Sequence, residues 1–457
     1  MGDKGERFIQ SLRDNRNVWL FGKRVDVTND PHFTGTLSTI SALYDRNDDV
    51  QTAFLVPNSL ADLEKRRAAF EAWSLATSGV MSRLSDYARS RLTGWYANRE
   101  HYRQYDGQFP DKIQAFYEGA KREQRFLTVV QRDPQINRSA DGSIAAEELG
   151  LLRITKKTSE GVRVSGAKMI GTSAPYSNDL IVYPLAKWGE EQKEQSSMLL
   201  VAADSPGLHM ICREPFSSNA AGDHPLSARF DEMDALLIFD DVLVPWERVL
   251  LHENPDALWS IKNDKVSSGL AYHQAITRLQ IKLEFAAAVA NEIAETIGAA
   301  GYLHVQEKMG ELLMQCQTIK ALLIASEAGG QVDAYGTYIP DFSYIETARN
   351  LGAVYYPHAL EVIQLIGAGG LIQTPSSVSD LHGDVSHLLQ KYFKGAGTDA
   401  VTRTKLFKLA WDLTSSPLGS RHELYERYYA GDPIRNKAGQ YLAHDKERWK
   451  TMVERYL

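Results

Sequence analysis

Cysteine is scarce in this sequence of 457 residues, which contains only Cys212 and Cys316, far apart along the chain. Two distant thiols cannot provide a disulfide framework, a cysteine-ligated zinc site or an iron–sulfur cluster held by cysteines. The histidines show no metal-ligand spacing either, since His382 and His387 lie five residues apart in a polar segment. We therefore expect no metal centre.

Long apolar runs and a signal sequence are also missing. No run approaches the roughly eighteen apolar residues that a membrane-spanning helix needs. The N-terminal segment MGDKGERFIQSLRDN is charged from the start and lacks the apolar core of a secretory signal. Glu6 stands where an N-myristoylation motif requires Ser or Thr. These absences predict a cytoplasmic protein without a membrane partner.

Positive charge is in deficit, and several common catalytic motifs are absent. The net charge of −7 and the pI near 6.0 argue against a nucleic-acid partner. The chain has no GxxxxGK(S/T), HExxH or GxSxG motif, which disfavours P-loop, zinc-protease and α/β-hydrolase functions. The segment GAGTDA at 395–400 fits a loose dinucleotide fingerprint, but it lies among helical patterns without a β-α-β context. We interpret it as a loop.

A β-rich segment lies between two helical regions. From about residue 151 to 251 apolar residues alternate with period two, and hairpin-like turns occur at Ser159–Gly161 and Ser177–Asp179. The region before it is mostly helical in pattern, and one helix is expected to follow the capping box Ser59–Asp62. This order of regions is suited to holding a flat cofactor between a sheet and helices.

After residue 253 the helical period returns. Four amphipathic helices are expected there, enough for an antiparallel bundle, and they cover 278–298, 304–330, 345–370 and 398–414. The whole pattern predicts an α+β protein with three domains, which comprise residues 1–130, 131–253 and 254–457.

Six segments that span nearly the whole chain resemble one enzyme family, the oxygenase component of the two-component FAD-dependent 4-hydroxyphenylacetate 3-monooxygenase and chlorophenol monooxygenase family. The longest is HPLSARFDEMDALLIFDDVLVPWERV at 224–249. The others are HFTGTLSTISALYD, which begins at His32, GVMSRLSDY (79–87), DPQINR (133–138), GAKMIGTSAPY (166–176) and GSRHELYERYYAGDPIR (419–435).

The resemblance implies an acyl-CoA dehydrogenase-like fold, with an N-terminal helical domain, a middle β-barrel domain and a C-terminal four-helix bundle. It implies reduced FAD supplied by a separate flavin reductase, and molecular oxygen as co-substrate, trapped as a flavin C4a-hydroperoxide. The substrate would be a small aromatic phenol that is hydroxylated ortho, or para with loss of a substituent. The segment from Gln364 to Gly370 resembles a turn at which acyl-CoA dehydrogenases meet a neighbour's FAD, which implies a homotetramer, although a glycine helix cap explains the same residues.

Arg83 and Tyr87 are the first candidates for catalysis. They are four residues apart, so a helix would place them on one face. Hydroxylation needs an electron-rich ring, so the site should hold a cation near the phenol oxygen. The resemblance implies that this pair binds the substrate hydroxyl beside the flavin. From the residues alone, Arg83 could instead pair with Asp86 on a solvated helix.

His273, in GLAYHQAITR, is the candidate base. The resemblance implies that it takes the phenolic proton, while a histidine at the start of a helix often has only a structural role. In the hydroxyphenylacetate enzymes a second histidine contacts the phenol oxygen, and here Val129 occupies that place in the substrate pocket. A Ser-Thr pair that holds the arylacetate carboxylate is replaced by Leu185 and Ala186. Both departures favour a phenol other than 4-hydroxyphenylacetate.

The flavin-binding candidates come from three segments. The resemblance points to the turn formed by Gln135, Ile136, Asn137 and Arg138, and to Thr172 on a strand. These groups would serve the N–H and carbonyl edges of the isoalloxazine ring. It also points to a C-terminal segment in which Arg435 could pair with the pyrophosphate; this segment comprises Asp432, Pro433, Ile434 and Arg435.

Three other functions remain open. A relative of 4-hydroxybutyryl-CoA dehydratase would need an iron–sulfur cluster on three cysteines and a histidine, yet Gln280 stands seven residues after His273 and the N-terminal helical region has no cysteine. A flavin acyl-CoA dehydrogenase would need a catalytic carboxylate over the flavin. A scaffold without activity would not consume oxygen when given reduced FAD.

Overall fold

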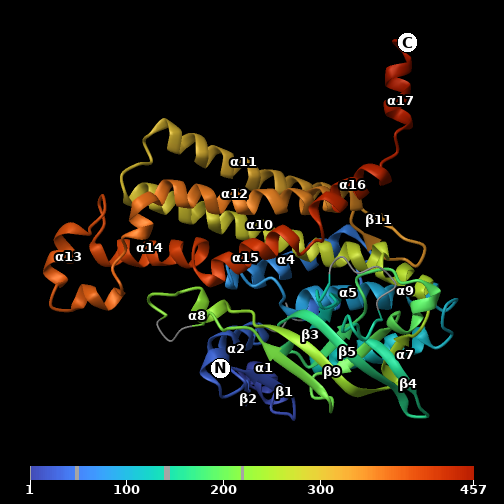
Figure 1. Ribbon diagram of the computed structural model, residues 1–457. Helices are drawn as coiled ribbons and strands as arrows, with labels where there is room; N and C mark the ends of the chain where they lie inside the picture. The colour runs from blue at the N-terminus through green and yellow to red at the C-terminus, as the bar shows by residue number, and fades with distance from the viewer. Residues whose placement is uncertain (1, 47–50, 138–144, 218–220) are drawn as a thin grey trace.

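The computed structural model describes residues 2–46, 51–137, 145–217 and 221–457. Two β-sheets lie on one side of a set of long helices, and the short helices of the N-terminal half lie beside and between them (Figure 1). Mixed α+β architecture was expected from the alternation of periods along the chain, and the structure confirms it.

The N-terminal region is mostly helical and adds two short strands. Ser59 caps one of these helices by accepting a hydrogen bond from the backbone N–H of Asp62 at 3.2 Å, as the capping box predicted. The helices are α1 (Asp3–Ser11), α2 (Pro31–Tyr44), α4 (Leu60–Ala76), α5 (Ser85–Ala97), α6 (Arg99–Tyr102) and α7 (Phe109–Glu123), and the strands are β1 (Asn17–Leu20) and β2 (Lys23–Val25).

Two sheets form the β region. The larger has six strands in the order β2-β1-β8-β9-β5-β4, and the smaller has four in the order β10-β7-β6-β3. Strands β1 and β2 therefore extend a sheet that otherwise comes from the middle of the sequence, through a parallel pairing of β1 with β8. The remaining strands of these two sheets are β3 (Leu127–Val130), β4 (Arg153–Lys157), β5 (Gly161–Thr172), β6 (Asp179–Val182), β7 (Met198–Ala202), β8 (Leu208–Cys212), β9 (Asp234–Pro245) and β10 (Val249–Leu251). Two short strands, β11 (Gln331–Val332) and β12 (Tyr338–Ile339), pair separately between α11 and α12.

Strands β5 and β9 are the longest and pair antiparallel, so that Thr172 lies opposite Asp234. The register shifts between Lys168 and Gly171, where Ile170 adopts a positive φ of 57°. A bulge of this kind re-aims the side chains around it. It precedes Thr172, one of the residues expected to face the flavin.

The C-terminal helices include all four that the sequence predicted. The expected start near residue 278 was wrong, because the first of them begins at Lys265, where Asp264 caps it through the N–H groups of Val266 and Ser267. The helices are α9 (Pro255–Lys262), α10 (Lys265–Thr296), α11 (Leu303–Ala328), α12 (Phe342–Ile372), α13 (Ser386–Tyr392), α14 (Ala400–Thr414), α15 (Pro417–Tyr428), α16 (Pro433–Ala443) and α17 (Glu447–Glu454).

Helices α5 and α10 approach each other closely, and this contact positions the candidate site. A Cβ at Gly94 would lie 2.2 Å from the Cα of Ser267, so only glycine allows the approach. The segment before α5 meets α10 at Gly79, whose φ is +65° and whose Cβ would lie 2.7 Å from the backbone nitrogen of Lys282. Residues 79–87 are thereby held against the start of the bundle.

Among the described residues, no helix is long and apolar enough to cross a membrane.

Candidate active site

The structure brings Arg83 and Tyr87 together. Arg83 lies just before α5, and its guanidinium carbon stands 3.8 Å from the centroid of the Tyr87 ring. Tyr425 of α15 lies on another side, 5.6 Å from the same guanidinium. Asp86 does not form the surface ion pair that the sequence left open, because it is buried and accepts hydrogen bonds from Gln274 and from its own neighbour's backbone N–H.

Three arginines surround Tyr87. Burial raises the pKa of this tyrosine, but Arg83, Arg91 and Arg349 oppose the effect and leave the pKa below its ordinary value. Arg91 lies two helical turns after Arg83 on α5, and Arg349 reaches in from α12. Cations placed in this way favour the phenolate form of a bound phenol, while burial opposes it.

A ring of polar contacts lies beyond Tyr87, at the ends of β3 and β6. The Tyr183 hydroxyl accepts hydrogen bonds from Gln131 at 2.7 Å and Arg91 at 3.3 Å, and Arg91 also donates to the carbonyl of Lys262. The Lys262 ammonium donates to the carbonyl of Leu185, whose N–H donates to the carbonyl of Gln131. The two departures seen in the sequence lie here: Leu185 is part of the ring, and half-buried Val129 is on β3.

An acidic cluster links the same site to Thr172. Glu232 accepts a hydrogen bond from the backbone N–H of Arg83 at 2.5 Å, and its other oxygen pairs with Arg421 at 3.0 Å. Arg421 also forms two hydrogen bonds to Asp234, which accepts the Thr172 hydroxyl at 2.6 Å. Burial would raise the pKa of Asp234, but Arg421 and Arg213 hold it well below its usual range. The hydroxyl hydrogen of Thr172 is therefore committed to Asp234, and its oxygen accepts a hydrogen bond from Arg421 at 3.4 Å.

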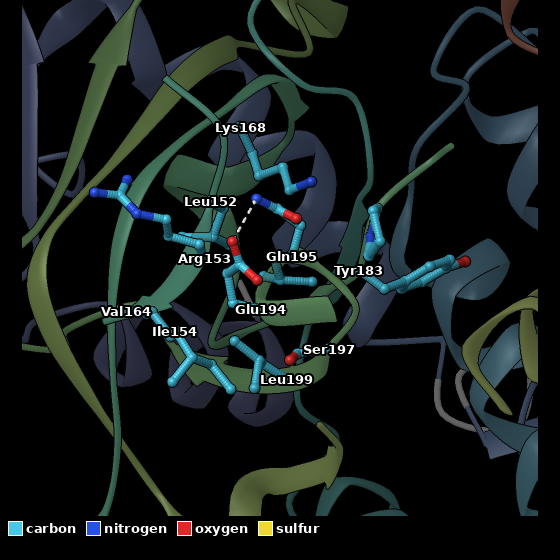
Figure 2. Close-up of a pocket in the computed structure, with 12 residues that line it drawn as sticks. Leu152, Arg153, Ile154, Val164, Lys168, Tyr183, Glu194, Gln195, Ser197 and Leu199 are labelled. Carbon is cyan, nitrogen blue, oxygen red and sulfur yellow. Dashed lines mark hydrogen bonds between the residues drawn. The ribbon is translucent and has the colours of Figure 1, made fainter. Parts of the chain in front are cut away.

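The turn expected to meet the flavin is exposed at Gln135, Ile136 and Asn137, while Arg138 lies outside the described residues. Its base is fixed to β5, because the buried Lys168 pairs with Asp133 at 2.5 Å and donates to a nearby carbonyl. Lys168 also lines a cavity between the two sheets, together with Gln195 and residues of β4, β6 and β7 (Figure 2). The turn thus presents its tip to solvent from a rigid anchor.

The C-terminal segment begins at the end of α15. Asp432 caps α16 by accepting the N–H groups of Ile434 and Arg435, and the side chains of Ile434 and Arg435 are exposed. Three residues before this cap, Tyr429 packs in one apolar cluster with Tyr87. Pro433 starts the helix.

His273 does not join this cluster, contrary to the expectation of a shared site. Its Nε2 lies 2.7 Å from Glu327 of α11, which also pairs with Arg67 of α4. Ala271 and Ala275 of the same helix pack against Tyr87. Because a helix turns about 100° per residue, a residue midway between these two points to the opposite side.

The chain matches two family models over most of its length. These are described as 4-hydroxyphenylacetate 3-hydroxylase N terminal, matched by residues 4–251, and C terminal, matched by residues 267–457. The chain belongs to the 4-hydroxyphenylacetate 3-hydroxylase family.

Curated relatives of this family are similar along the whole chain. The 4-hydroxyphenylacetate 3-monooxygenase oxygenase component of Thermus thermophilus is 32% identical, over 100% of this chain and 98% of that protein. The 4-nitrophenol 2-monooxygenase oxygenase component of a Rhodococcus species is also 32% identical, over 94% of this chain and 86% of that protein.

Solved structures agree. An oxygenase component of 4-hydroxyphenylacetate 3-monooxygenase complexed with FAD and 4-hydroxyphenylacetate has a TM-score of 0.94 and 32% identity, over 100% of this chain and 98% of that one. An archaeal 4-hydroxybutyryl-CoA dehydratase from N. maritimus has a TM-score of 0.85 over 95% and 91% of the two chains. Its identity of 21% makes it a likeness of fold alone.

Several residues of this 4-hydroxyphenylacetate 3-hydroxylase family member were missed from the sequence. Arg91 could have been found, since it continues the four-residue spacing of Arg83 and Tyr87. Glu232 and Asp234 stood inside the longest matching segment, but their spacing follows no catalytic motif. Arg349 could not be recognised from the sequence, because it lies on an amphipathic helix, where a polar residue at such a position is ordinary.

Proposed function

We propose that this protein is the oxygenase component of a two-component, FAD-dependent monooxygenase that hydroxylates a small phenol. Molecular oxygen is the co-substrate, and a separate flavin reductase supplies reduced FAD through transient contact. The observation that carries the proposal is the position of Arg83, whose guanidinium carbon lies 3.8 Å from the centroid of the Tyr87 ring. Arg91 and Arg349 also interact with Tyr87. The name of the Thermus thermophilus relative and the FAD complexes of similar structures support it.

The residues present fit a bound flavin. The turn at Gln135–Asn137 is exposed, and the Thr172 oxygen, which accepts one hydrogen bond from Arg421, has a second lone pair for a ring N–H. Arg435 is exposed at the start of α16, where both its charge and the helix N-terminus would favour a phosphate. When bound, reduced FAD supplies, together with oxygen, the electrophilic oxygen atom that reaches the aromatic ring. Arg138 stays in the proposal from the sequence alone.

The chain's own residues prepare the substrate. Arg83 and Tyr87 hold the phenol oxygen, and the positive charge of Arg83 lowers the free energy of the phenolate relative to the phenol. Glu232 fixes the backbone of Arg83, so the guanidinium is held in place before the substrate arrives. We propose that His273 acts as a positioning residue, since it ties α10 to α11 through Glu327 and does not reach the phenol.

The substrate pocket favours a phenol that differs from 4-hydroxyphenylacetate in its contacts. Val129 and Leu185 lie where polar side chains would otherwise serve the phenol oxygen and the acid group. Val129 is half-buried on β3, and Leu185 contributes only backbone groups to the ring of contacts around Tyr183.

The architecture supports two further parts of the proposal. We infer an acyl-CoA dehydrogenase-like arrangement, with domain boundaries near residues 130 and 253. We also infer a homotetramer, a dimer of dimers, since α11 and α12 expose Leu313, Met314 and Leu365. At the segment that suggested a neighbour's FAD, Ala368 breaks the helix with a φ of +43°. Light scattering after gel filtration measures the oligomeric state.

The test of the function is direct. Purified protein is given FAD reduced by a flavin reductase, oxygen and a panel of small phenols. We expect a hydroxylated product with little hydrogen peroxide for at least one phenol. Oxygen consumption with peroxide alone across the panel would contradict the proposal. Reduction of the protein's FAD by an acyl-CoA thioester would instead favour a dehydrogenase, and iron in the purified protein would favour the dehydratase.

A further inference from the structure

Arg349 of α12 is held in place but leaves donors unused. Its guanidinium lies 3.5 Å from the centroid of the Tyr272 ring, and one nitrogen donates to the carbonyl of Ala430 at 3.2 Å. Its Nε is inaccessible and has no hydrogen-bond partner in the described part of the chain. The hydroxyl of Tyr429 is also inaccessible and without a hydrogen-bond partner among the described residues. Tyr429 interacts electrostatically with Arg349, so the two side chains are neighbours.

The charge around this group is also unbalanced. Arg349 faces Tyr87 together with Arg83 and Arg91. None of the three lies within ion-pair distance of a carboxylate among residues 2–46, 51–137, 145–217 and 221–457. Glu346, one turn away on α12, interacts with Arg349 without forming an ion pair. Arg91 is buried, and Arg83 and Arg349 are half-buried. Cations taken out of water without a counter-charge are costly, so this cluster suits a ligand that brings negative charge.

A comparison of Arg349 with Arg403 shows which features of Arg349 are particular to its surroundings. Arg403 of α14 also lies over an aromatic ring, 4.4 Å from the centroid of Phe393, donates once to a carbonyl, and has an unpartnered Nε. Burial lowers the pKa of Arg403, whereas tyrosines around Arg349 raise its pKa despite its burial. Arg403 stands apart from the three arginines around Tyr87, so nothing there concentrates positive charge for a ligand.

We propose that Arg349 and Tyr429 form an oxyanion-binding site at the bundle side of the active site. The planar guanidinium can present two parallel N–H groups to a carboxylate or a phosphate, and the tyrosine hydroxyl supplies a third donor. Two ligands of the proposed reaction could bring such a group, namely an acidic substituent of the phenol and a phosphate of the flavin. The inference rests on the proposed function, whose site it extends.

Occupation by the substrate would name the substrate class. The enzyme would then favour phenols that carry an acidic group, and the anchor would come from α12 and not from the strand end where Leu185 and Ala186 stand. Occupation by the flavin would instead add a contact between the bundle and a phosphate of the cofactor.

The test compares ligand pairs that differ by one charge, in R349M, R349K and Y429F variants. Dissociation constants are measured for 4-hydroxyphenylacetate against 4-hydroxyphenylacetamide, and for FMN against riboflavin, by quenching of protein or flavin fluorescence. We expect R349M to weaken the charged member of one pair at least 10-fold and its neutral partner less than 2-fold. R349K should recover part of the loss, and Y429F should show a smaller loss of the same selectivity.

R403M is the matched control and should leave both pairs unchanged. Weakening of the acid identifies the substrate as the source of the anion, and weakening of FMN identifies the flavin. Equal effects on charged and neutral ligands, or no effect on either pair, would overturn the proposal. Circular dichroism of each variant separates a loss of binding from a loss of fold. Binding needs no turnover, so a wild type that binds anions through Arg349 but hydroxylates nothing would refute only the proposed function.

Discussion

Two groups of buried or half-buried arginines in this molecule differ in what balances their charge. On one side, Arg278 pairs with Glu426 at 2.7 and 3.0 Å, and Arg421 pairs with Glu232 and Asp234. On the other, the three arginines around Tyr87 meet tyrosines, hydroxyls and carbonyls. The first group joins elements of the fold, while the second leaves positive charge for something that the chain itself does not provide.

The comparison predicts that the paired group determines stability. In E426Q, Arg278 and Lys282 would lose their shared carboxylate, because Glu426 accepts hydrogen bonds from both. Leaving buried charges unpaired typically costs about 3–5 kcal/mol. We expect a loss of that size in the free energy of unfolding, measured by urea denaturation. E423Q on the same helix is the control, since its exposed pair with Arg427 should change stability by less than about 1 kcal/mol.

The same carboxylate predicts an acid limit. Burial would raise the pKa of Glu426, but Arg278 and Lys282 lower it to about 2. A depressed folded-state pKa contributes stability that is present above the unfolded value of 4.5 and is lost as pH falls towards about 2. Unfolding measured across this window should depend less on pH in E426Q than in the wild type. Identical pH dependence in the two proteins would contradict the assignment.

The unpaired group should show the reverse behaviour. Arg83→Met removes the cation that we propose holds the phenol oxygen, and loss of one such donor typically lowers kcat roughly 100- to 1000-fold. Stability should change by less than about 1 kcal/mol, because Glu232 holds the backbone of Arg83 and not its guanidinium. Arg99→Met is a matched control, since Arg99 lies 4.3 Å from the Tyr96 ring away from Tyr87. Retained activity with lost stability would place Arg83 in the structural group.

Substitution of His273 is expected to have the smallest effect of these changes. His273→Asn should lower stability by about 1–3 kcal/mol, since a buried hydrogen bond to Glu327 is weakened. The ratio of hydroxylated product to hydrogen peroxide should stay as in the wild type, because the ring faces away from Tyr87. A shift towards peroxide at unchanged stability would return His273 to the chemistry.

The fold could be read from the sequence where its pattern is long. The bundle helices and the strands between residues 151 and 251 could be predicted, because their apolar residues recur with periods of 3.6 and 2. Strands β1 and β2 did not, because three or four residues are too few to show alternation, and β1 pairs with a strand about 190 residues away. Short strands of this kind are recognised only through their partners.

The site could be predicted in part. Arg83 and Tyr87 were accessible because four-residue spacing on a helix is a local property. The direction of His273 could not be predicted, because it depends on the phase of α10 relative to α5, which packing at Gly94 and Ser267 determines. Arg349 joins the site only through the docking of α12, and no spacing along the chain reports a contact with residues more than 250 positions earlier.

Glu232 grips the main chain of Arg83, and this has an evolutionary consequence. The anchor would survive replacement of the side chain at position 83, since every amino acid except proline offers the same N–H. The side chain at position 83 could thus be exchanged to accept new substrates, while the backbone at this position stays fixed by Glu232. Such an enzyme would need few compensating mutations when its substrate changes. More would be needed in an enzyme whose binding cation also formed, through its side chain, the contact that holds the backbone.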